Sequence, residues 1–169
     1  METVLKPLEE ILRLNTGLAL NCLAGLSEAD AKARPLPAAN SVAFLMVHLV
    51  DARFFMGKLL GCPGDNPLAE DYADVNKIED AKSLPSLKEL REAWLAASTH
   101  LAGCLDRATL EELAAPSNQK FPVADKSVLG GLAFLVQHDS YHLGQLAILR
   151  RGLGRGAMSY ERTPLVADG

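Results

Sequence analysis

The sequence predicts an all-α fold, a four-helix bundle with one long crossover connection. Four segments of the 169-residue chain carry apolar residues at the three-to-four spacing of amphipathic helices. No segment shows the apolar–polar alternation of a β-strand, and no internal repeat is found. A chain of this length forms one domain, so residues 1–169 are expected to fold as a single bundle.

The first two helices are predicted at residues 2–26 and about 40–60. Either Asn40 or Ser41 provides the N-cap of the second helix, because both side chains accept hydrogen bonds from free backbone N–H groups. This helix is apolar nearly all round, which is typical of a central helix or of one that also faces another subunit. The run Gly61-Cys62-Pro63-Gly64 ends it.

An acidic connection of residues 63–85 precedes the third helix. It is interpreted as a crossover between parallel neighbours, with a lid over a pocket as the alternative. The third helix opens on a capping box at Ser86 and Glu89. His100 lies off the apolar stripe of this helix and is interpreted as an exposed or flanking residue, not as a ligand.

The fourth helix is predicted from Asp125 or Ser127 to about Arg151. Gly144 lies inside it, and the pair Gly130-Gly131 lies near its start. Glycine costs about 1 kcal/mol relative to alanine within a helix, so both sites indicate a close helix–helix approach.

Composition excludes several classes of function. The net charge is −4 and the basic residues do not cluster, apart from a small group at the end of the last helix, so no nucleic-acid partner is expected. The longest apolar runs, residues 42–50 and 128–136, are too short to span a membrane. No signal peptide is recognised. The three cysteines are odd in number and form no CxxC pair, which predicts a reducing, cytoplasmic location.

The pattern that carries chemistry is the pair His138 and His142. Residues four apart lie on the same face of a helix, so both imidazoles can point at one spot. A zincin protease would have glutamate directly after the first histidine, and Asp139 stands there instead. The alternative is that both histidines belong to the core and bond to the backbone or to Tyr141.

His48 lies on the second helix, flanked by Val47 and Leu49. An imidazole buried in such an apolar face needs a partner. Three neutral imidazoles from two packed helices can share one divalent cation, and a fourth position is then left for water or substrate. Zinc and nickel both suit this ligand set.

A ligating imidazole usually hydrogen-bonds a second group through its other nitrogen. Asp51, Asn15 and Gln145 are candidates for that role, and Gln145 and Tyr141 are candidate pocket residues. Gln145 is one helical turn beyond His142, where it could contact a metal-bound water or substrate. Its alternative role is that of an ordinary polar residue near the end of the bundle.

The runs Asn40-Ser41-Val42, His48-Leu49 and His138-Asp-Ser-Tyr-His142-Leu-Gly-Gln145 resemble the DinB/YfiT-like superfamily of metalloenzymes. The resemblance covers nearly the whole chain. It implies a four-helix bundle, usually dimeric, in which His48, His138 and His142 bind a divalent metal ion. The family includes thiol-transferases that use bacillithiol, isomerases that depend on mycothiol or glutathione, and metal-dependent hydrolases.

Three hypotheses follow from these residues. The first is a metal-dependent hydrolase or thiol-dependent transferase that acts on a small molecule, with a low-molecular-weight thiol as a second cofactor in the transferase case. The second is a non-catalytic homodimeric bundle that binds metal for stability or sensing. The third is a bundle without metal, whose histidines only pack. A homodimer is expected from the apolar girth of the second and fourth helices.

Overall fold

We describe the protein from a computed structural model, in which residues 2–36, 38–72, 75 and 77–161 are described. Four long helices form a bundle, as the sequence predicts, and no strand occurs in these ranges. Three short α-helices and one 3-10 turn, Ile78–Asp80, lie in the described parts of the connections. The α-helices are α1 Glu2–Leu23, α2 Glu28–Lys32, α3 Val42–Leu59, α4 Ala69–Tyr72, α5 Leu87–Arg107, α6 Leu110–Ala114 and α7 Val128–Gly152.

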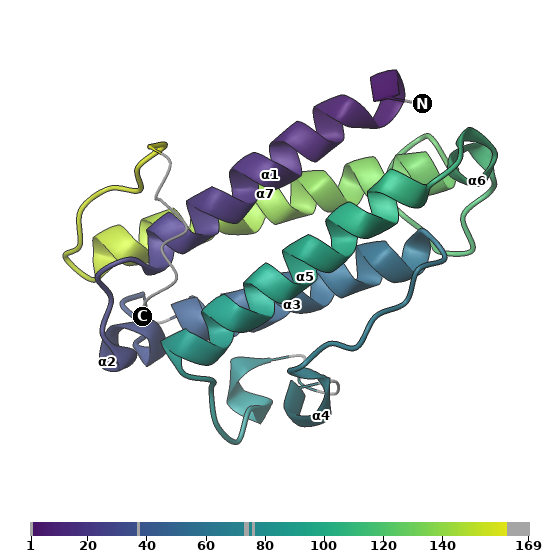
Figure 1. Ribbon diagram of the computed structural model, residues 1–169. Coiled ribbons are helices and arrows are strands. Elements are labelled where there is room, and N and C mark those ends of the chain that lie inside the picture. The colour runs from purple at the N-terminus through teal and green to yellow at the C-terminus, as the bar shows by residue number, and fades with distance from the viewer. Residues whose placement is uncertain (1, 37, 73–74, 76, 162–169) are drawn as a thin grey trace.

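The four long helices form a ring in which α1 neighbours α5 and α7, and α3 also neighbours α5 and α7. Helices α1 and α7 run in one direction, whereas α3 and α5 run in the other (Figure 1). The connection after α3 must therefore travel back along the bundle before α5 begins, which is the crossover expected from residues 63–85. Within it, the Tyr72 hydroxyl donates to the Ser83 carbonyl at 3.0 Å.

Helix starts follow the predicted capping chemistry. Ser41, and not Asn40, caps α3 by accepting from the Phe44 N–H, and Ser127 caps α7 by accepting from the Gly130 N–H. The first helix ends three residues earlier than expected, at Leu23. Ser27 then caps the separate short helix α2 through a capping box with Asp30.

Helix α3 is buried on nearly every side, as its apolar sequence indicates. It packs against α2, α5 and α7. The apolar surface of α3 is therefore covered by other helices of the same chain. It gives no reason to expect a subunit interface at α3. None of the described helices combines the length and the apolar character that crossing a bilayer requires.

Arg53 connects all four long helices. Its guanidinium donates to the Asp139 carboxylate on α7 at 2.9 Å, and to the Leu12 carbonyl on α1 at 3.1 Å. It also donates to Ser98 on α5 at 2.6 Å, and it lies 3.6 Å above the centre of the Trp94 ring. A buried guanidinium needs this many partners because an uncompensated charge in the core costs several kcal/mol.

A close approach occurs at Gly130 and Gly131, but it is made by the loop that precedes α7 and not by another helix, as was expected. A Cβ atom on Gly130 would lie 2.4 Å from the Asp125 carbonyl oxygen, and one on Gly131 would lie 2.4 Å from the Phe121 ring. A Cβ atom on Gly144 would meet none of the described atoms within 4 Å. The interpretation of Gly144 as a packing contact is therefore wrong, because the helix face it occupies is open to solvent.

Candidate metal centre

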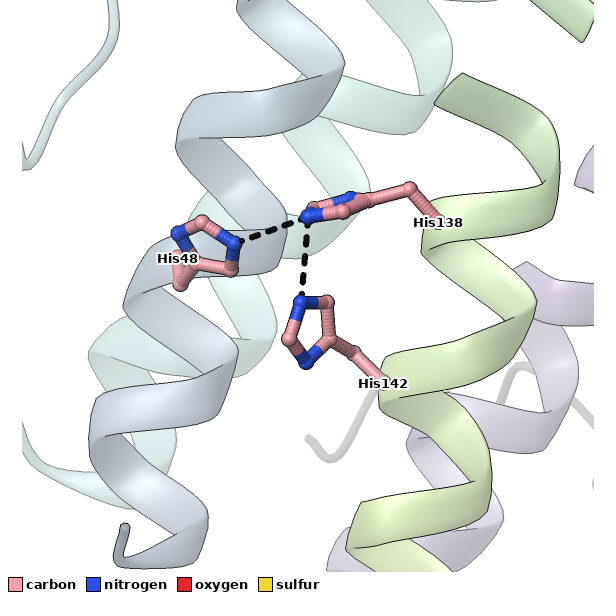
Figure 2. Close-up of side chains that lie close together, drawn as sticks. All are labelled: His48, His138 and His142. Carbon is pink, nitrogen blue, oxygen red and sulfur yellow. Dashed lines mark hydrogen bonds between the residues drawn. The ribbon is translucent and has the colours of Figure 1, made fainter. Parts of the chain in front are cut away.

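The three predicted histidines meet between α3 and α7. His48 projects from α3, while His138 and His142 project one turn apart from α7, and their rings point toward one another (Figure 2). The Nε2 atom of His138 lies 3.1 Å from that of His48 and 3.0 Å from that of His142. One ring nitrogen from each residue lies within 4.8 Å of the other two.

The cluster lies at the edge of the bundle rather than in its interior. His48 is exposed, and His138 and His142 are half-buried. The expectation that His48 would be buried in an apolar face is therefore wrong: its neighbours on α3 are buried, but its own position faces the solvent side of the α3–α7 seam. A solvent-reached edge is compatible with the entry of a small molecule.

The environment favours the neutral form of two of the imidazoles, His48 and His138. Desolvation of the ring, followed by the proximity of His142 and His138, lowers the pKa of His48 to about 4, although the residue keeps solvent contact. Desolvation and the proximity of His142 also lower the pKa of His138, and Asp139 opposes this shift. Neutral imidazole is the form that offers a lone pair to a metal ion.

Gln145 determines which nitrogen of His142 carries the proton. The Gln145 side-chain oxygen lies 2.6 Å from Nδ1 of His142, and the Gln145 amide donates to the Tyr141 hydroxyl at 3.2 Å. An amide oxygen only accepts hydrogen bonds, so with the Gln145 amide oriented in this way Nδ1 carries the proton. The Nε2 atom of His142 then carries no proton, and its lone pair points at the other two rings.

Hydrogen bonds alone do not satisfy this arrangement. His138 can donate to only one of its two neighbours, and its buried Nδ1 atom has no partner among the described residues. Three ligands at 2.0–2.1 Å in a tetrahedral site would lie about 3.3 Å apart, close to the observed 3.0 and 3.1 Å. The donor set therefore fits a divalent cation.

The other candidate residues lie in different surroundings. Asn15 is buried and donates to the Asp139 carboxylate at 3.1 Å and to the Ser140 hydroxyl at 3.0 Å. Asp51 is exposed and accepts from the Asn66 amide at 3.3 Å. Of the three candidates for contact with an imidazole, Gln145 is the one for which the structure gives such a contact.

Two groups of residues were missed by sequence reasoning. Arg53 and Asp139 form a buried ion pair, and a lone arginine inside an apolar helix was the signal for it. The second group is Cys62, His100 and Cys104, whose ligand atoms also lie within 4.8 Å of one another. Only the four-residue spacing of His100 and Cys104 on α5 was visible in the sequence.

The fold and this cluster define a class: crossover-connected four-helix bundles with a candidate three-histidine metal centre between two helices. The family described as the DinB superfamily matches residues 11–146, a range that includes His48, His138 and His142. The chain therefore belongs to the DinB superfamily. None of the curated proteins compared with the chain matches it.

A solved structure supports the fold. It is described as the crystal structure of the conserved protein of locus from Enterococcus faecalis, and its TM-score is 0.67. The alignment covers 90% of this chain and 98% of that chain at 21% sequence identity. At this identity the likeness supports the architecture of the bundle and no statement about activity.

Proposed function

We propose that this protein is a divalent-metal-dependent enzyme, of the hydrolase or thiol-dependent transferase class, which acts on a small molecule. One observation carries the proposal: three imidazole nitrogens converge at a solvent-reached edge of the bundle. In the part of the chain that the structure describes, no cysteine, carboxylate or fourth histidine joins them within the same distance. A site of this kind leaves a coordination position for water, thiol or substrate.

In this proposal His48, His138 and His142 are the ligands. Gln145 is a positioning residue, because its side-chain oxygen holds His142 in the tautomer with a free Nε2 lone pair. Tyr141 in turn accepts from the Gln145 amide and is exposed, so its hydroxyl is available to a bound molecule. A zinc or nickel ion acts as a Lewis acid and lowers the pKa of a water or thiol that it binds.

A non-catalytic metal-binding bundle is the second candidate. A structural metal site is normally closed by a fourth protein ligand, whereas a catalytic site keeps a position open. The three-ligand group and the exposure of His48 favour the open, catalytic kind.

The test compares metal-loaded and metal-free protein in two assays. One assay measures conjugation of an electrophile with bacillithiol, mycothiol or glutathione, and the other measures hydrolysis of a panel of esters and amides. We expect turnover in one of them that is lost after chelation, restored by zinc or nickel, and absent in His138→Ala. Lys88→Ala, at an exposed position on α5, is the surface control.

Turnover that persists in His138→Ala or in the metal-free protein would contradict the proposal. Metal binding without turnover in any of these reactions would favour the non-catalytic bundle.

A further inference from the structure

A second cluster of ligating side chains lies at the opposite end of α3 from its N-cap. Cys62 belongs to the turn that follows α3, and His100 and Cys104 lie one turn apart on α5. The Sγ atom of Cys104 lies 3.5 Å from Nε2 of His100, and one ligand atom of each residue lies within 4.8 Å of the others. The group is about three helical turns along α3 from His48, so it is separate from the three-histidine cluster.

The His100 ring is held in place by close packing. It stacks on the Phe54 ring, with centroids 5.4 Å apart and planes at 25°. A Cβ atom on Gly57 would lie 2.8 Å from Nε2 of His100, and one on Gly64 would lie 2.6 Å from it. Both glycines leave space that the imidazole fills, so the ring reaches the cysteines only because these two positions lack side chains.

The distances suit a tetrahedral cation. A thiolate at 2.3 Å and an imidazole at 2.0–2.1 Å from zinc would lie about 3.5 Å apart, which is the separation found between Cys104 and His100. Two sulfur atoms and one nitrogen form a softer ligand set than three imidazoles, and thiolates select zinc and other thiophilic ions. The plainer role for His100 is donation from Nε2 to the Cys62 carbonyl, which lies 3.0 Å away.

The positive charge of Arg107 favours the thiolate form of Cys62. The Arg107 guanidinium donates to its Sγ atom at 2.6 Å. Hydrogen bonds from the Cys104 thiol and from Arg107 lower the pKa of Cys62. Burial raises the pKa of Cys104 to about 12, so a cation that binds there must displace the Cys104 proton to solvent.

We propose that Cys62, His100 and Cys104 form a second, thiophilic metal site of the zinc type, which fastens the start of the crossover connection to α5. Arg107 offsets the negative charge of the two thiolates. The fourth coordination position of the metal ion is left to water or to a small ligand. No further cysteine, histidine or acidic donor in the described ranges joins the group. This proposal does not depend on the function proposed above.

Cobalt(II) is the probe, because thiolate ligands give it a near-ultraviolet charge-transfer band that imidazole ligands do not produce. Reduced, untagged, full-length protein is titrated with Co²⁺ and followed by absorption. We expect this band, together with the visible bands of tetrahedral Co²⁺, in the wild type. The three-histidine cluster contains no sulfur, so its failure to bind metal would not remove the band.

Cys62→Ser and Cys104→Ser should each weaken Co²⁺ binding at the sulfur site by more than about 100-fold. This is a larger loss than the one caused by replacing a residue that contacts a ligand but not the metal. Cys62 is half-exposed in a turn, so its variant tests the site even if the buried Cys104 position does not tolerate serine. Cys22→Ser, at a buried cysteine outside the cluster, should keep the band. Absence of the band in the reduced wild type, or its persistence in Cys62→Ser, would overturn the proposal and leave His100 as a donor to the Cys62 carbonyl.

Discussion

The Arg53 guanidinium on α3 lies 2.9 Å from the Asp139 carboxylate on α7, and both side chains are almost completely buried. Asp139 directly follows His138, and neighbouring residues of a helix point in different directions. While Asp139 faces Arg53 in the core, His138 faces His48 across the seam of α3 and α7. The ion pair and the histidine contact therefore belong to one rotation of α7, in which its two histidines face α3.

The first prediction concerns this pair. Arg53→Met or Asp139→Asn removes one charge and leaves the other buried without an opposite charge beside it, so each should lower the free energy of unfolding by about 3–5 kcal/mol. Urea unfolding followed by circular dichroism measures the change. Lys88→Ala, which breaks the exposed pair with Glu92 at 3.9 Å, should leave the unfolding midpoint nearly unchanged. Equal effects of the buried and exposed substitutions would contradict the role given to Arg53.

The second prediction concerns Gln145. Gln145→Ala removes the acceptor for Nδ1 of His142, so zinc affinity should fall about 10- to 100-fold while the helix content stays the same. Gln145→Glu keeps an acceptor at this position and should restore most of the affinity. Isothermal titration with Zn²⁺ compares the three proteins. An alanine variant that binds as tightly as the wild type would remove Gln145 from the site.

The third prediction separates two glycines of α7. Gly130→Ala places a methyl group against the backbone of Asp125 and should lower stability by about 1–3 kcal/mol. Gly144→Ala meets no neighbour within the described ranges and should raise stability by about 0.5–1 kcal/mol, because alanine favours the helix. Thermal unfolding of the two variants gives the sign of each change. The packing described for α7 is refuted if both substitutions act in the same direction.

The fourth prediction is a homodimer formed through α1 and α7, which are neighbours in the bundle. Both helices carry exposed apolar side chains, which contact with a second copy of the chain would cover. These side chains are Val4, Ile11, Leu14 and Ile148.

Sedimentation velocity at micromolar concentration should give a dimer for the wild type and a monomer for the double variant Ile11→Glu/Ile148→Glu. Leu110→Glu, at an exposed leucine on α6, is the matched control and should stay dimeric. A monomeric wild type would exclude this interface.

Helix positions and the histidine cluster were predictable because each depends on short-range patterns. Ser41, Ser86 and Ser127 cap helices by bonding to N–H groups three residues away, which is a local property of the sequence. His138 and His142 share a face because of helical spacing. The choice of His48 as the third member depended on the apolar pattern that placed its helix against the last one.

The remaining contacts depend on tertiary packing that local pattern does not encode. Arg53 and Asp139 are separated by 86 residues, and nothing in either segment specifies the other. Asn15 was a candidate neighbour of the imidazoles, yet helix rotation directs it to Asp139 and Ser140. His48 was expected to be buried, but its position on α3 coincides with the one side that α5, α7 and α2 leave open.

The most direct test is elemental analysis of tag-free protein, since an affinity tag would add histidines of its own. If the three imidazoles hold a cation, zinc or nickel should be present in the wild type, and His138→Ala and His48→Ala should each lose the equivalent bound at this site. The histidine variants are also measured in protein that carries Cys62→Ser, so that metal bound at the sulfur site does not add to the measured metal content. Full metal retention in Cys62→Ser/His138→Ala, with the fold intact by circular dichroism, would contradict the metal centre on which the proposed function rests.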